Sequence, residues 1–234
     1  MNMTFEQIKA EIKARKFRPI YLLMGDEPFF IDQLTDMLSD TVLPVEERDF
    51  NQTVVYGMET DVPTVISLAR SFPMMSEYQV VIVKEAQGLS KIDDLAIYAQ
   101  NPLKSTILII NYKGGTLDKR KRLWAEVEKN GVTLESAKIP DYKMPAFIVS
   151  FVQSKGLAID GKAAQMLTDY LGNDLNKLSN EIDKLIIALP PNQKQVTAEI
   201  IELNIGISKD FNNYELLKAV VEKDIYKINQ IADY

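Results

Sequence analysis

Residues 21–32 read YLLMGDEPFFID, and this stretch sets the expectation for the fold around it. The apolar run at residues 19–24 is typical of a buried parallel strand. Gly25–Pro28 is a turn sequence, and apolar side chains then recur at helical spacing through residues 29–38. A strand, a glycine turn and a helix in this order form the setting of a phosphate-binding loop.

The turn lacks the residues that bind a nucleotide. A phosphate-binding loop reads G-x-x-x-x-G-K-[ST], because its amides and Lys hold phosphates while the hydroxyl holds Mg²⁺. Here Gly25 has no second Gly and no Lys-Ser/Thr pair at the required spacing, and Asp26 and Glu27 add negative charge. The sequence predicts a degenerate nucleotide site. For this loop alone, an ordinary strand-to-helix turn is the alternative.

A second element of an ATPase is altered in the same direction. An ATPase places Asp-Glu after a buried strand, where the carboxylates hold Mg²⁺ and activate water. In QVVIVKEA (residues 79–86), Lys84 takes the Asp position and Glu85 follows. Because a Lys repels Mg²⁺, we expect a chain that does not hydrolyse ATP, the alternative being an unrelated strand end with surface charges.

Composition excludes several chemistries. The 234 residues contain no Cys and no His, which removes disulfides, thiolate catalysis, Ser-His-Asp arrangements and His-based metal sites. The net charge of −6 argues against wholesale electrostatic binding to nucleic acid or an anionic membrane. We expect no secretory leader, no membrane span and a cytoplasmic location.

Strand and helix patterns alternate through residues 1–140, which predicts a parallel sheet with helices on both faces. Further strands are expected at residues 51–56, 79–83, 106–110 and 132–134. Further helices are expected at residues 4–16, 62–70, 93–100 and 117–129.

The second half of the chain carries helical patterns only. Helices are expected at residues 145–154, 160–170, 174–189, 197–203 and 213–223. They predict a small all-α domain at residues 141–207 and the start of a third domain at 208–234. The sequence reaches Tyr234 within a helix-like segment that has no stop signal, which predicts that the third domain is truncated.

A cluster of apolar residues lies between a predicted helix and the strand after it. The sequence SFPMMS (residues 71–76) places Phe72, Met74 and Met75 next to a turn. A functional interpretation is an exposed hydrophobic wedge that fills an apolar pocket of a partner. From sequence alone the favoured alternative is that these side chains fold back onto the core.

Four consecutive cations, Lys119, Arg120, Lys121 and Arg122, could approach a phosphate backbone. Given the acidic total, a solvated helix face is the favoured alternative.

Together these segments resemble the delta subunit family of the bacterial DNA polymerase III clamp loader. The matching pieces are PIYLLMGDEPFFID, SFPMMSEYQVVIVKEA, TILIINYKGGTLDKRKRLWAEVEKNG, GNDLNKLSNEIDKL and ISKDFNNYELLKAV, in the expected order along the chain. The resemblance implies an AAA+-like α/β domain with a degenerate nucleotide site, then a helical lid and a helical collar.

The resemblance also implies a function without catalysis or cofactor. Such a subunit of the DNA-directed DNA polymerase (nucleotidyltransferase) holoenzyme binds the sliding clamp (beta) and favours its opening in DNA replication. Gamma/tau and delta-prime subunits use the ATP, primer–template DNA is reached through the assembled complex, and no membrane is involved. The family's wedge falls on Phe72, Met74 and Met75, although this chain differs by its two Met residues and Pro73.

Two other functions remain open on sequence grounds. One is a divergent P-loop ATPase that binds nucleotide near Gly25 in an unusual way. The other is a nucleic-acid-binding adaptor that uses residues 119–122.

Overall fold

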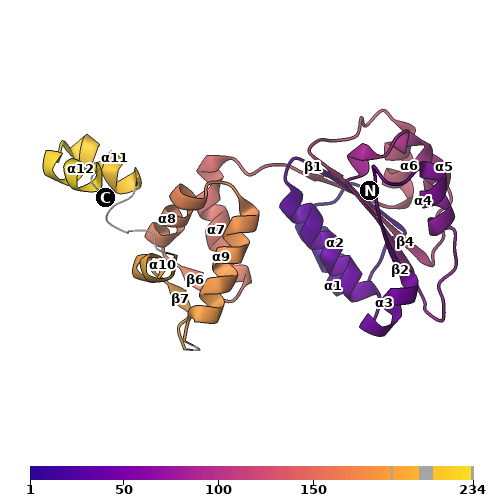
Figure 1. Ribbon diagram of the computed structural model, residues 1–234, viewed down its shortest axis with the longest axis horizontal. Coiled ribbons are helices and arrows are strands. Elements are labelled where there is room, and N and C mark those ends of the chain that lie inside the picture. The colour runs from indigo at the N-terminus through magenta and orange to yellow at the C-terminus, as the bar shows by residue number, and fades with distance from the viewer. Residues whose placement is uncertain (191, 206–212, 233–234) are drawn as a thin grey trace. The chain divides into compact units, whose positions relative to one another are not determined.

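The structure is a computed structural model that describes residues 1–190, 192–205 and 213–232. The chain divides into two compact units, Met1–Lys138 and Ile139–Tyr234 (Figure 1). The three-domain division stays a prediction, because its boundary at 207/208 lies outside the described residues, as do the last two residues of the helical segment expected up to Tyr234.

The first unit is built on a parallel five-stranded sheet in the order β2-β3-β4-β1-β5. Its strands are β1 (Ile20–Gly25), β2 (Gln52–Tyr56), β3 (Gln79–Lys84), β4 (Thr106–Lys113) and β5 (Val132–Ser136). All six residues of β1 are buried between β4 and β5, as a continuous apolar strand requires. The predicted parallel sheet is confirmed.

Helices cover both faces of this sheet (Figure 1). The helices of the first unit are α1 (Phe5–Lys13), α2 (Pro28–Val42), α3 (Val45–Asn51), α4 (Val62–Ala69), α5 (Ala96–Ala99) and α6 (Arg122–Asn130). Alternate strand residues point to opposite faces, so Leu23 packs with α1 and α2 while Leu22 packs with α4, α5 and α6. The α/β architecture with helices on both faces of the sheet, as expected from the sequence, is confirmed.

One helix start in this unit was predicted wrongly, one helix differs in type over its first turn, and one helix was missed. The helix expected from residue 117 begins at Arg122, because the Asp118 carboxylate accepts from the Arg120 N–H at 2.9 Å and closes a turn. The short helix expected at residues 93–100 is present, as a 3₁₀ turn, Ile92–Leu95, that continues into α5. Helix α3 was not expected, since its sequence VEERDFN has no apolar periodicity.

The second unit is helical. It contains α7 (Met144–Ser154), α8 (Gly161–Leu171), α9 (Leu175–Ala188), α10 (Ala198–Ile205), α11 (Asn213–Glu222) and α12 (Ile225–Ala232). It also contains two short parallel strands, β6 (Ala158–Ile159) and β7 (Gln195–Val196), which the all-α prediction did not include. Strands of two residues are too short to produce a periodic sequence signal.

Among the described residues, no helix of either unit is long and apolar enough to span a membrane.

Candidate functional site

The turn between β1 and α2 is short and tightly packed. Only Asp26 and Glu27 separate the strand from the helix. The Glu27 N–H donates to the Ser136 carbonyl at 3.2 Å, and the Ser136 hydroxyl donates to the Glu27 carbonyl at 2.7 Å. Gly25 has φ +137°, and a Cβ there would lie 1.9 Å from the Ser136 carbonyl oxygen. The turn is too short and too closely packed to wrap around a phosphate.

The start of α2 is occupied by the chain's own carboxylate. A helix N-terminus attracts anions, because its first N–H groups are unpaired and its dipole is positive there. Here Glu27, 6% exposed, accepts from the Phe29 N–H at 3.1 Å, and Pro28 has no N–H to offer. A phosphate at this helix start would meet a carboxylate.

The predicted residues at the end of β3 lie on the same edge of the sheet as this turn. Lys113, in register with Gly25, has its Nζ 2.8 Å from an Asp32 oxygen and 3.5 Å from Glu85. Burial alone would lower the pKa of Lys113, but the hydrogen bond to Asp32 and the attraction of both carboxylates raise it. Glu85 is therefore engaged by a cation of the chain itself. Its neighbour Lys84 is the last residue of β3.

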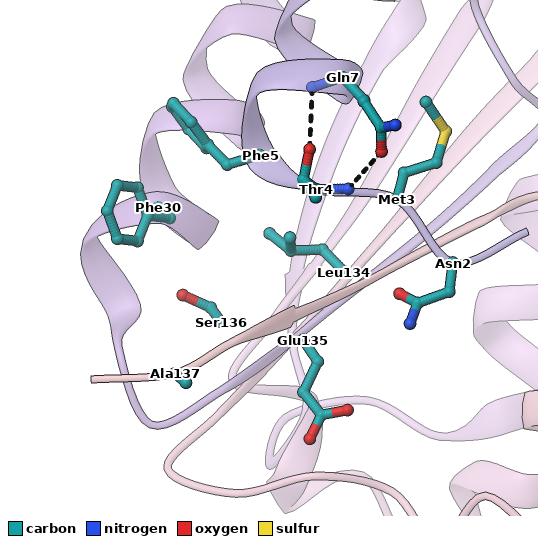
Figure 2. Close-up of a pocket in the computed structure, with 10 residues that line it drawn as sticks. All are labelled: Asn2, Met3, Thr4, Phe5, Gln7, Phe30, Leu134, Glu135, Ser136 and Ala137. Carbon is teal, nitrogen blue, oxygen red and sulfur yellow. Dashed lines mark hydrogen bonds between the residues drawn. The ribbon is translucent and has the colours of Figure 1, made fainter. Parts of the chain in front are cut away.

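A pocket of about 360 Å³ borders the turn, between the start of α1 and the end of β5. Figure 2 shows Phe5 and Phe30 beside one another at this pocket, with Ser136 and Glu135 on the strand that lines it. The two ring centroids are 4.9 Å apart. The lining residues include no Lys or Arg, and the carboxylate of Glu135 pairs with Lys119 outside this set at 2.7 Å. The pocket therefore does not complement a triphosphate.

The loop between α4 and β3 exposes its apolar side chains, unlike the closely packed β1–α2 turn. Residues 71–78 form neither helix nor strand. The exposed fractions of Phe72, Met74 and Met75 are 78%, 61% and 101%. The alternative in which these side chains fold back onto the core is therefore wrong. Met75 also has φ 52°, a left-handed conformation that is unfavourable for a residue with a side chain.

Two buried amide side chains hold the backbone of this loop. Gln79, at the start of β3, donates to the carbonyl of Leu68 in α4 (3.1 Å) and to that of Ser71, the first residue of the loop. Asn51, at the end of α3, bonds to the backbone of Met74. Sequence reasoning missed Asn51, because its partner lies 23 residues away and no local pattern marks the contact.

The cationic run does not form a helix face. Lys119 pairs with Glu135 at 2.7 Å, and Arg120 pairs with Asp118 at 2.7 Å. Of the four cations only Arg122 lies within α6, and the preceding Lys121 is its N-cap residue. Two of the four charges are thus offset by nearby carboxylates.

The parallel sheet, its helices on both faces and the helical unit that follows define an α/β protein with a helical second unit. The sequence model of the family "DNA polymerase III, delta subunit" matches residues 21–137, and the chain belongs to this family. The family resemblance drawn from the sequence is confirmed.

Two relatives that are named as delta subunits agree with this assignment. The chain is 25% identical over 231 residues to DNA polymerase III subunit delta of Bacillus subtilis (strain 168), covering 94% of this chain and 66% of the relative. It is 21% identical over 227 residues to the probable DNA polymerase III subunit delta of Aquifex aeolicus (strain VF5), covering 92% and 63%. The chain thus spans just under two thirds of these relatives.

A solved structure supports the fold. The Bacillus subtilis DNA clamp loader delta protein (YqeN) superimposes with a TM-score of 0.75 at 22% identity, covering 97% of this chain and 70% of that one.

Proposed function

We propose that this chain is a clamp-loader subunit that binds the sliding clamp through the apolar loop of Phe72, Met74 and Met75. In this proposal it favours the open state of the clamp during DNA replication. The observation that carries the proposal is the exposure of these three large apolar side chains on a loop whose backbone is held by hydrogen bonds from two buried residues, Asn51 and Gln79. Membership of the DNA polymerase III delta family supports the choice of partner.

The chemistry of the loop suits an apolar pocket. A phenyl ring and two flexible thioethers fill an irregular greasy cavity, and a few such anchors supply most of the binding free energy of an interface. Clamp opening then requires no reaction by this chain. A subunit that binds the open clamp more tightly than the closed one shifts the equilibrium by that difference in affinity.

The proposal includes no catalysis by this chain and no nucleotide cofactor. The short β1–α2 turn, with Glu27 over the start of α2, favours this over a divergent ATPase. ATP would be used by gamma/tau and delta-prime subunits of the same cytoplasmic assembly, a part of the polymerase holoenzyme. Primer–template DNA would be reached through that assembly. A direct DNA contact through residues 119–122 has less support, because two of those cations are paired.

Titration calorimetry of the chain against the sliding clamp of the same organism, without ATP, tests the proposal. We expect binding that Met74→Ala weakens about 30-fold, the effect of a hot-spot side chain of about 2 kcal/mol. Met58, 87% exposed and outside the loop, supplies the matched control Met58→Ala, which should leave the affinity unchanged. A folded chain that does not bind, or equal losses in both variants, would overturn the proposal.

A further inference from the structure

Asn51 makes a two-point contact with the apolar loop. Its side chain is 4% exposed. Its Oδ1 accepts from the Met74 N–H at 2.6 Å, and its Nδ2 donates to the Met74 carbonyl at 3.1 Å. The same Nδ2 lies 3.1 Å from the Glu47 carbonyl, which ties the amide to its own helix α3. One side chain thus satisfies both backbone groups of Met74, as a neighbouring strand would.

The loop needs such a contact, because its apolar side chains do not hold it. Phe72, Met74 and Met75 are all exposed, so they contribute little packing against the rest of the unit. Met75 is also held in a left-handed conformation, which the surrounding structure must enforce. Gln79 bonds to Leu68 in α4 and to Ser71, the first residue of the loop, whereas the backbone of Met74 further along the loop bonds to Asn51.

We propose that Asn51 is a positioning residue for clamp binding. It holds Met74 so that the loop presents its three apolar side chains in the binding conformation before the partner arrives. Preorganisation raises affinity, because the loop then loses less conformational freedom on association. This inference rests on the proposed function, and it names a residue that acts through Met74 rather than by touching the clamp.

Hydrogen exchange of the free chain tests the positioning without any partner. We expect the Met74 amide to be protected in the unmodified chain and to lose that protection at least about tenfold in Asn51→Ala. The amide of Val81 in β3 should stay protected in both. An unprotected Met74 amide in the unmodified chain, or unchanged protection in the variant, would overturn the inference. Should Asn51→Ala not fold, Asn51→Asp keeps the size and the acceptor while removing the donor, and partial loss at Met74 is expected.

Clamp affinity supplies the second readout. We expect Asn51→Ala to bind the sliding clamp about tenfold more weakly, the equivalent of about 1.4 kcal/mol. The control is Thr35→Val, which removes a buried hydroxyl of α2 that lies 2.8 Å from the Ile31 carbonyl and 3.0 Å from Asn111. It should leave clamp affinity unchanged. Equal losses in both variants would make Asn51 merely structural and overturn its role in binding.

The two readouts separate this inference from the proposed function. If the unmodified chain does not bind the clamp, the proposed function is wrong, and the role of Asn51 in clamp binding is overturned with it. Loss of Met74 protection in Asn51→Ala would still support Asn51 as the residue that positions the loop.

Discussion

The β1–α2 turn and the α4–β3 loop are connections of one parallel sheet, yet they differ in what they leave exposed. The turn lies at the carboxyl ends of the strands, where Gly25 and Glu27 pack against Ser136. The loop enters β3 at the amino end, where Phe72 and Met74 face solvent. The comparison teaches that one parallel sheet can fill the connection at one edge with the chain's own atoms and leave the connection at the other edge exposed.

The free energies involved differ in the same way. Packing in the turn contributes to the stability of the isolated chain. The exposed side chains of the loop make no such contribution to the isolated chain. Burying each of them against a partner would contribute about 1.5–3 kcal/mol to binding. Changes in the turn should therefore lower stability and leave clamp affinity unchanged. Changes in the loop should lower clamp affinity without lowering stability.

The largest expected effect is that of Gly25→Ala. A Cβ at this position would lie 1.9 Å from a backbone oxygen, and φ is +137°. We expect the free energy of unfolding to fall by about 3 kcal/mol or more, as measured by urea denaturation. Gly114→Ala is the matched control, because φ is +69° there but no atom lies within 4 Å of a new Cβ. It should cost about 1–2 kcal/mol, and equal losses would show that the turn is not tightly packed.

Phe72→Ala should affect binding alone. The side chain is 78% exposed, so the free energy of unfolding should change by no more than about 0.5 kcal/mol. Clamp affinity should fall about 30-fold, or about 2 kcal/mol. Urea denaturation and calorimetry on the same sample check both numbers. A stability loss typical of a core truncation would contradict the wedge.

Glu27→Ala also tests the packed turn, with a smaller expected loss of stability than Gly25→Ala. Loss of this N-cap should lower the free energy of unfolding by about 1 kcal/mol. The change also removes the carboxylate at the start of α2. Because the turn stays two residues long, we expect no ATP binding by calorimetry, and clear ATP binding by the variant would show that Glu27 alone closes the site.

Met75→Gly should move stability and binding in opposite directions. The left-handed backbone, φ 52°, suits Gly, and the fully exposed side chain has no packing to lose. We expect the free energy of unfolding to rise by about 0.5–1 kcal/mol while clamp affinity falls. Met58→Gly is the control, since Met58 is exposed but is not among the residues with positive φ. A rise in both the free energy of unfolding and the clamp affinity would show that Met75 is not part of the binding surface.

Much of the fold could be predicted from the sequence, because the inner strands are continuous apolar runs and helix starts such as Asp61 and Asp160 are marked by capping residues. Helix α3 could not, since charged residues dominate it and tertiary contacts decide its conformation. The start of α6 was misplaced because the Asp118 side chain competes with the helical backbone.

The candidate site could be predicted only in part. The missing Lys and Ser/Thr after Gly25 can be read directly, but the packing of the turn against Ser136 depends on residues 109 positions apart. The bonds between Asn51 and the backbone of Met74 join residues 23 positions apart and have no local signal. Local sequence therefore identifies which residues are unusual, and tertiary hydrogen bonds decide where they lie.

Hydrogen exchange across the whole chain, measured with the sliding clamp and separately with ATP and Mg²⁺, tests the central claim most directly. We predict that the clamp slows exchange at residues 71–78 and that ATP changes nothing at residues 25–29. Protection of the β1–α2 turn by ATP, or clamp protection that leaves the loop unchanged, would contradict the account.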